Sequence, residues 1–109
     1  MIIYEVNLTI DPDSAEEYAT WLQPHIAHIL EIDGFLSAEW FERDTAFDGS
    51  DADKTRWTIH YRLRDRAALK AYQRDHAPAL IREGLDKFGE RLTATRRVLQ
   101  PAENQPQPK

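Results

Sequence analysis

Four segments of the chain alternate apolar and polar side chains with a period of two, the pattern of β-strands that bury one face. In the first segment the even-numbered residues from Tyr4 to Ile10 are all apolar, whereas the odd-numbered ones are mixed. In the third segment the odd-numbered residues from Trp57 to Leu63 form the apolar face. The pattern predicts strands over residues 2–10, 35–43, 55–63 and 91–99.

Two further segments carry apolar residues at helical spacing. The first, over about residues 13–32, begins with a capping box at residues 14–17 and contains Pro24, which predicts a kink. The second runs over residues 65–88 and contains Pro78, which predicts a break or kink. The chain therefore combines four strands with two helical segments.

Each helical segment belongs to a repeated unit of strand, acidic residue and helix. Asp11 precedes Tyr18 by seven positions, Asp65 precedes Tyr72 by the same number, and the two units lie 54 positions apart. Another predicted strand follows each unit, so the order is β-α-β-β-α-β. This order predicts a ferredoxin-like α+β fold, with two helices on one face of a four-stranded antiparallel sheet.

The predicted domain covers residues 1–100. Within it, the acidic segment 44–53 has no apolar period, which predicts a mobile hairpin loop. Residues 101–109 contain no large apolar side chain, and we expect a disordered tail there.

The other face of this sheet has no helix to cover it. We expect the second strand to place Phe35 and Phe41 on one face and Trp40 on the other. The uncovered face would then carry Ile3 and either Trp40 or Phe41 among polar groups. An exposed apolar patch of this kind predicts a homodimer in which two sheet faces meet.

The composition is that of an ordinary globular domain, since 41% of the 109 residues are hydrophobic and 10% are aromatic. A formal net charge of −5 argues against a nucleic-acid partner. The absence of cysteine excludes a disulfide framework, a thiolate nucleophile and a cysteine zinc site. With no apolar run long enough to span a bilayer and no visible signal peptide, we expect a cytoplasmic protein with no membrane partner.

Several stretches of the chain resemble a known superfamily. Residues 33–41, Asp-Gly-Phe-Leu-Ser-Ala-Glu-Trp-Phe, are similar to the second-strand signature of the dimeric α+β barrel superfamily. That superfamily includes antibiotic-biosynthesis monooxygenases, haem-degrading monooxygenases and muconolactone isomerases. Residues 61–72 and 76–78 are similar to its third strand and second helix. More narrowly, residues 1–8 and 96–99 resemble a small bacterial family of unknown function within that fold, which implies a ferredoxin-like homodimer.

The resemblance to the haem-degrading members is incomplete. Asn7 lies in the first strand, where those enzymes also carry an asparagine. Arg82, however, stands where they carry an axial histidine, and His76 lies about a turn and a half earlier. We therefore expect no haem, no other cofactor and no metal.

Four polar side chains on the uncovered face are candidates for a site: Glu5 and Asn7 on the first strand, and His60 and Arg62 on the third. We expect these strands to be parallel neighbours at the centre of the sheet, which would bring the four side chains together. His60 or Glu5 is then the predicted catalytic base, and Asn7 and Arg62 are predicted to bind a ligand. Alternatively, Glu5 pairs with Arg62 and Asn7 with His60 across the dimer, and the group is only structural.

Trp57, together with His76 at the helix break, completes the predicted ligand-binding set. His25 and His28, three positions apart on the first helix, either share a metal or face solvent. Five aromatic residues either line a cavity between sheet and helices or simply fill the core; they are Tyr18, Trp21, Trp57, Tyr61 and Tyr72.

Two functions fit these features. The first is a ligand-binding protein or cofactor-free enzyme, monooxygenase-like or isomerase-like, that takes a small aromatic or anionic molecule in the cleft between sheet and helices. The second is a non-catalytic dimerisation or interaction module, in which the polar sheet face is only interface.

Overall fold

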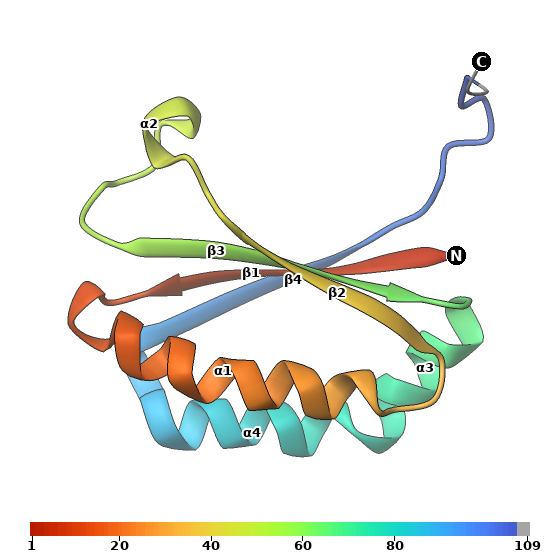
Figure 1. Ribbon diagram of the computed structural model, residues 1–109, viewed down its shortest axis with the longest axis horizontal. Coiled ribbons are helices and arrows are strands. Elements are labelled where there is room, and N and C mark those ends of the chain that lie inside the picture. Colours follow the sequence, from red (N-terminus) through yellow and green to blue (C-terminus); the bar gives the residue numbers. More distant parts are fainter. Residues whose placement is uncertain (107–109) are drawn as a thin grey trace.

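The computed structural model describes residues 1–106 and shows a twisted sheet with three helices on one side (Figure 1). Short 3-10 turns at Pro12–Ser14 and Gly89–Arg91 precede the first long helix and the last strand. The main elements are β1 (Ile2–Ile10), α1 (Ala15–Leu30), β2 (Phe35–Glu42), α2 (Thr45–Asp48), β3 (Thr55–Leu63), α3 (Arg66–Asp75), α4 (Ala77–Phe88) and β4 (Leu92–Leu99). The predicted ferredoxin-like α+β fold is confirmed.

The strand order is β2-β3-β1-β4, and each neighbouring pair is antiparallel. The expectation that the two central strands are parallel is wrong, because Glu5 of β1 pairs with His60 of β3 in an antiparallel register. The reason is the hairpin between β2 and β3. The crossover through α1 makes β2 run in the same direction as β1. The hairpin then makes β3 run in the opposite direction to both.

The core lies between the sheet and the layer formed by α1, α3 and α4. The even-numbered side chains of β1 and the odd-numbered ones of β3 point into it, as the period of two predicts. Ile10, Ile59 and Leu63 are the most deeply buried of these strand residues. The helices add Tyr18, Leu22, Ile29, Leu69, Tyr72, Leu80 and Phe88.

A β-bulge between Phe35 and Ser37 changes the predicted faces of β2. Phe35 turns into the core, although the plain alternation placed it on the same face as Phe41. After the bulge, Trp40 packs edge-on against Trp57 in the core, with ring centroids 5.0 Å apart. Phe41 therefore belongs to the open face, because a bulge shifts which residues share a side of the sheet.

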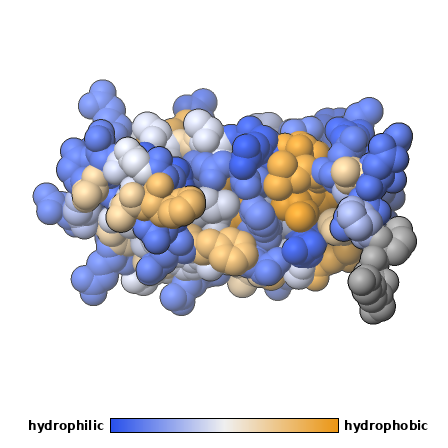
Figure 2. All heavy atoms as spheres, turned by 90° about the horizontal axis from the view of Figure 1, so that it is seen from above, coloured by the Kyte–Doolittle hydropathy of each residue, from blue (hydrophilic) through white to orange (hydrophobic). Residues whose placement is uncertain are grey.

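The open face carries both polar groups and exposed apolar side chains. Phe41 is 44% exposed there and lies 5.5 Å from the ring of His60. Figure 2 shows this face, which is mainly hydrophilic, with its most hydrophobic area toward the end that carries the C-terminal segment. Register places Ile3 of β1 beside Leu99 of β4 at that end of the sheet.

Several local expectations change in the structure. Ser14 does not cap α1 with its side chain; its hydroxyl accepts a hydrogen bond from Arg91 Nη1 at 3.0 Å. α1 is continuous through Pro24, and the kink expected there stays a prediction. The second helical segment breaks at His76, and Pro78 lies in the first turn of α4, where a missing N–H costs little.

The segment 44–53 is not wholly irregular, because it contains the short helix α2. Asp44 caps this helix by accepting a hydrogen bond from the backbone N–H of Phe47 at 2.9 Å. Residues 100–106 form neither helix nor strand, and the remainder of the predicted tail, 107–109, lies outside the described residues.

Gly34, at the turn from α1 into β2, provides a direct test of the packing between this turn and α3. Its φ of +93° belongs to the left-handed region, and an added Cβ would lie 2.4 Å from Ala68 Cβ. Gly34→Ala should therefore lower the free energy of unfolding by about 3 kcal/mol or more, since strain and clash add.

Gly49→Ala is the matched control for this substitution. Gly49 has a φ of +76°, but nothing lies within 4 Å of its added Cβ, so only the backbone strain of about 1 kcal/mol applies. Urea unfolding of both variants measures the difference, and equal losses would show that the contact with Ala68 is unimportant.

Candidate functional site

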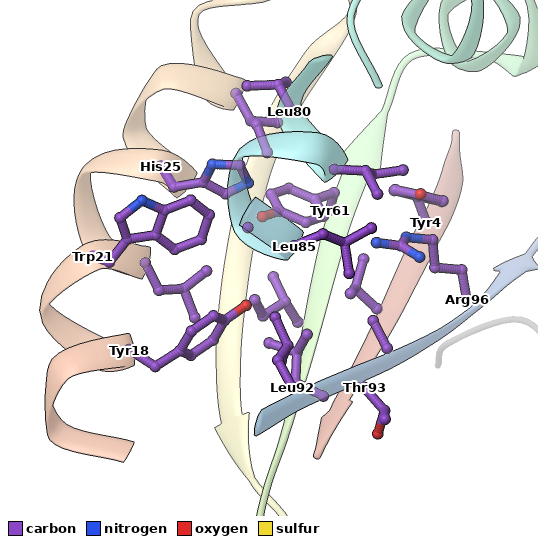
Figure 3. Close-up of a pocket in the computed structure, with 18 of the residues that line it drawn as sticks. Tyr4, Tyr18, Trp21, His25, Tyr61, Leu80, Leu85, Leu92, Thr93 and Arg96 are labelled. Carbon is purple, nitrogen blue, oxygen red and sulfur yellow. The ribbon is translucent and has the colours of Figure 1, made fainter. Parts of the chain in front are cut away.

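A cavity of about 420 Å³ lies between the sheet and helices α1 and α4 (Figure 3). Its wall is mostly apolar and aromatic. The described residues that line it are Tyr4, Val6, Leu8, Tyr18, Trp21, Leu22, His25, Ile29, Ile59, Tyr61, Tyr72, Leu80, Ile81, Gly84, Leu85, Leu92, Thr93, Ala94 and Arg96. Of the five aromatic residues that could line a cavity or fill the core, four line the cavity. The fifth, Trp57, belongs to the core.

The four tyrosines of this wall remain uncharged at neutral pH. Burial raises the pKa of Tyr18 and of Tyr72 to about 12, and it also raises the pKa values of Tyr4 and Tyr61. In each case the positive charge of Arg96 opposes the rise. The tyrosines thus offer neutral hydroxyl groups that can donate or accept hydrogen bonds.

Arg96 supplies the permanent charge among the described lining residues. It projects from the edge strand β4 on the side that faces the helices, and its guanidinium group points toward Tyr4 and Tyr61 in Figure 3. Because its charge influences all four tyrosines, it lies within electrostatic reach of the whole aromatic wall. An anionic group in this cavity would find its counter-charge at Arg96.

A second cluster of polar residues lies on the open face, centred on Glu5. The Glu5 side chain is only 5% exposed. Its carboxylate accepts hydrogen bonds from Asn7 Nδ2 at 2.9 Å and from Arg97 Nε, and its Oε1 lies 2.8 Å from His60 Nε2. Asn7 in turn accepts a hydrogen bond from Thr58 Oγ1 at 2.7 Å. Three strands are thus joined through one carboxylate.

Glu5 is held in its charged form by these partners. Burial acts to raise its pKa, but hydrogen bonds from Arg97, Asn7 and His60 outweigh burial and lower the pKa to about 2. A carboxylate with so low a pKa is a weak base at neutral pH. The geometry therefore favours an anchoring role for Glu5, and the catalytic role of Glu5 and His60 stays a prediction.

The remaining predicted site residues lie apart from this cluster. Arg62 donates a hydrogen bond from Nε to Glu39 Oε1 at 2.9 Å, and within residues 1–106 it makes no hydrogen bond with Glu5. Trp57 is buried in the core, and its ring stacks on that of Tyr18 with centroids 6.1 Å apart. His76 is exposed at the junction of α3 and α4 and does not line the cavity.

Glu5, Asn7, His60 and Arg62 lie on the opposite side of the sheet from the cavity. The prediction that they orient a ligand in the cleft between sheet and helices is therefore wrong about their location. The alternation along β1 makes the reason plain, because Tyr4 and Val6 line the cavity and the residue between them points away.

Sequence reasoning missed two charged groups, Arg97 beside Glu5 and Arg96 in the cavity wall, and it did not place His25 at the cavity. Arg96 and Arg97 stand on opposite faces of β4 by simple alternation. The register of β4 against β1 places Arg97 opposite Glu5. Predicting this register would have revealed the contact of Arg97 with Glu5. For metals, the described residues contain no group of three potential ligands, so His25 and His28 have no third partner there.

Residues 1–102 match the family described as a domain of unknown function, DUF4286. The chain belongs to this family. No curated protein matches it. Within residues 1–106 no helix combines the length and apolar character needed to cross a membrane.

Solved structures share the fold at low sequence identity. A mutant of SnoaB, a cofactor-independent oxygenase from Streptomyces nogalater, aligns over 97% of this chain and 98% of its own, with 13% identity and a TM-score of 0.65. A Deinococcus radiodurans protein described as an antibiotic biosynthesis monooxygenase aligns over 100% of both chains, with 16% identity and a TM-score of 0.62. The de novo designed protein Foldit4 aligns over 93% of this chain and 98% of its own, with 9% identity and a TM-score of 0.61. These likenesses show a ferredoxin-like α+β fold, and a fold of this kind does not by itself specify an activity.

The low pKa of Glu5 predicts a specific pH dependence of stability. Because folding lowers this pKa from 4.5 to about 2, the ionised carboxylate stabilises the fold above the higher value, and the contribution is lost as the pH falls toward the lower one. The shift corresponds to at most about 3 kcal/mol. Glu5→Gln should remove this acid-dependent loss in urea unfolding followed from neutral to acidic pH.

Glu39→Gln is the control for that experiment. Glu39 lies on the same face and pairs with Arg62, but its side chain is 44% exposed. It should keep the pH dependence of the wild-type protein. A Glu5→Gln variant that still loses stability on acidification like the wild type would contradict the assignment.

Proposed function

We propose that the protein binds a small, flat aromatic molecule carrying one acidic or anionic group in the cavity between its sheet and helices. The observation that carries this proposal is an aromatic cavity of about 420 Å³ with a single guanidinium group in its wall. Ligand pockets commonly measure about 300 to 1,000 Å³ and combine an apolar lining with a few polar groups. The size and chemistry of this cavity fit that description.

The aromatic wall favours a planar ligand. Tyr18, Trp21 and Phe88 pack edge-on or tilted against one another, which holds the α1 side of the wall rigid. Tyr4, Tyr61 and Tyr72 form a second cluster, with ring centroids 5.8 and 6.2 Å from that of Tyr4. A flat molecule would find ring faces and edges on both sides.

We propose further that any reaction in this cavity proceeds without a metal or organic cofactor. Support comes from SnoaB, which shares this fold and is described as a cofactor-independent oxygenase. A monooxygenase-like or isomerase-like reaction is consistent with a cavity whose described lining includes one cation, four neutral tyrosine hydroxyl groups and one imidazole.

Arg96 should govern the affinity for anionic ligands. Anilinonaphthalene sulfonate and N-phenylnaphthylamine are fluorescent aromatic molecules of similar shape, and only the first is an anion. Arg96→Gln should weaken binding of the sulfonate about tenfold and leave binding of the neutral amine nearly unchanged.

Arg74→Gln removes the same charge on α3, away from the described cavity lining, and serves as the control. Fluorescence titration of the three proteins measures both affinities. Failure of the wild-type protein to bind either probe would argue against the cavity as a binding site.

The open face of the sheet is proposed as the interface of a homodimer. It combines the exposed apolar side chains of Phe41 and Met1 with charged groups of both signs, such as Glu39 and Arg62. Arg56 adds a buried Nε atom without a hydrogen-bond partner within the described residues. A second copy of the chain would cover the apolar groups and offer a partner for such an atom.

Phe41→Glu should shift the protein from dimer to monomer. The substitution removes a central apolar contact and places two like charges near each other, so we expect the dimer dissociation constant to rise about a hundredfold or more. Size-exclusion chromatography with light scattering over a range of concentrations measures this change.

Leu30→Glu, at the end of α1 in the helical layer, is the control and should leave the dimer intact. A wild-type protein that is monomeric at every concentration would reject this interface. It would favour a different cover for the open face.

A further inference from the structure

We infer that His25 takes the proton from an acidic hydroxyl group, that of a phenol or an enol, bound in the cavity opposite Arg96. This inference rests on the proposed function and assigns a role and a ligand class within it. The sequence alone indicates for His25 either a shared metal site with His28 or a solvent-facing position.

Among the described groups that line the cavity, His25 is the candidate base. Six described lining residues are titratable: the four tyrosines, Arg96 and His25. The pKa values of the tyrosines are raised, so their hydroxyl groups keep their protons at neutral pH, and arginine keeps its charge throughout. His25 is thus the group in this wall that can accept a proton near neutral pH.

The imidazole ring of His25 lies at the boundary between the cavity and the surface. His25 lies on α1 and stacks on Trp21, with centroids 4.5 Å apart and an interplanar angle of 23°. The same histidine lines the cavity and also a surface groove between α1 and α4, which contains His28 and Glu83. The imidazole therefore stands between the interior and the solvent, so a proton accepted inside has a route out through the groove.

Figure 3 shows the ring of His25 on the α1 side of the cavity and the guanidinium group of Arg96 on the β4 side, with Tyr61 between them in that view. A planar ligand lying across the cavity would present one end to each. The base, His25, and the counter-charge, Arg96, are thus separated. Arg96 therefore does not donate a hydrogen bond to the His25 nitrogen that must accept the proton.

The charges around His25 keep it neutral and able to act as a base. Burial lowers its pKa, Glu83 on α4 opposes this effect, and His28 on the same helix adds to it. Toward the cavity, the tyrosines are neutral and Arg96 is positive. Since the folded pKa lies below the ordinary value of 6.5, the imidazole is uncharged at neutral pH and becomes protonated only in more acidic solution.

The proton transfer balances without any further reagent. The O–H bond of the ligand breaks and its electron pair stays on the oxygen, while an N–H bond forms on the imidazole of His25. The negative charge spreads through the conjugated ligand toward the Arg96 guanidinium group at its other end. The imidazolium keeps its proton while the ligand is bound and releases it to solvent in the groove after the ligand has left.

The chemistry of the base selects the ligand class. A carboxylic acid is already ionised at neutral pH and needs no base, whereas the hydroxyl group of an ordinary alcohol is far too weak an acid for an imidazole. The phenol of tyrosine has a pKa of about 10, only a few units above that of histidine, so transfer to His25 is feasible when a cation stabilises the anion.

The experiment uses para-nitrophenol, whose anion absorbs visible light, and para-nitroanisole, its methyl ether, which has no proton to lose. Both are titrated against the wild-type protein in slightly acidic buffer. We expect the wild-type protein to bind both and to raise the ratio of ionised to neutral nitrophenol in the bound state about tenfold, equivalent to one pKa unit. The response should fade at lower pH, where His25 is protonated before the ligand arrives.

His25→Gln should bind nitroanisole like the wild type but lose the increase in ionised nitrophenol. His25→Phe should behave in the same way, because it keeps an aromatic ring beside Trp21 and removes both nitrogen atoms. His28→Gln removes an imidazole three positions away on α1, outside the described cavity lining, and should retain the response. NMR of the imidazole protons in the wild-type complex should show His25 in the protonated form.

The outcomes separate this inference from the proposed function. Binding of both probes with an unchanged ionisation response in the His25 variants would overturn the role of His25 and leave the binding cavity in place. Binding of neither probe by the wild-type protein would reject both. Loss of nitroanisole binding in both His25 variants would also overturn the inference, because His25 would then be needed to shape the cavity.

Discussion

The pleat of β1, held between β3 and β4, is the constraint on which the rest of the structure depends. Because successive side chains of a strand point to opposite faces, Tyr4 and Val6 face the helices while Glu5 faces the other way. One set builds the core and the aromatic cavity. The other set builds the polar network on the open face. A slip of the register by one residue would exchange the two and destroy both.

Glu5 shows how this constraint is made stable. A carboxylate that is nearly removed from solvent is costly unless hydrogen-bond donors surround it. Here the donors come from three strands, since Asn7 lies on β1 itself, His60 on β3 and Arg97 on β4. The network therefore specifies register as well as supplying stability. Any alternative pairing of the strands would leave a buried charge without partners.

A cavity remains between the helical layer and the sheet, where the core of a small domain is normally filled by side chains. Tyr18, Trp21 and Phe88 pack closely at one side, but the wall toward β4 is lined by Ala94 and Arg96, which do not fill the space between sheet and α4. Keeping such a space costs packing energy that a purely structural module would have no reason to lose. The cavity, with a cation on one side and an imidazole on the other, is therefore the part of the molecule to which we assign the proposed function.

The sequence by itself determined the order of strands and helices, the helix break at His76 and Pro78, and the side of β1 and β3 that enters the core, because these depend on local periodicity and on proline. It also placed Glu5, Asn7 and His60 on one face. Only the tertiary structure decided that the bulge at Phe35 sends Phe41 to the open face, that Arg97 completes the Glu5 network, and that the aromatic residues enclose a cavity with Arg96 and His25 in its wall. The physical reason is distance along the chain: these relations join residues of β1, α1, β3 and β4, and they arise only when strand register and helix packing bring those elements together.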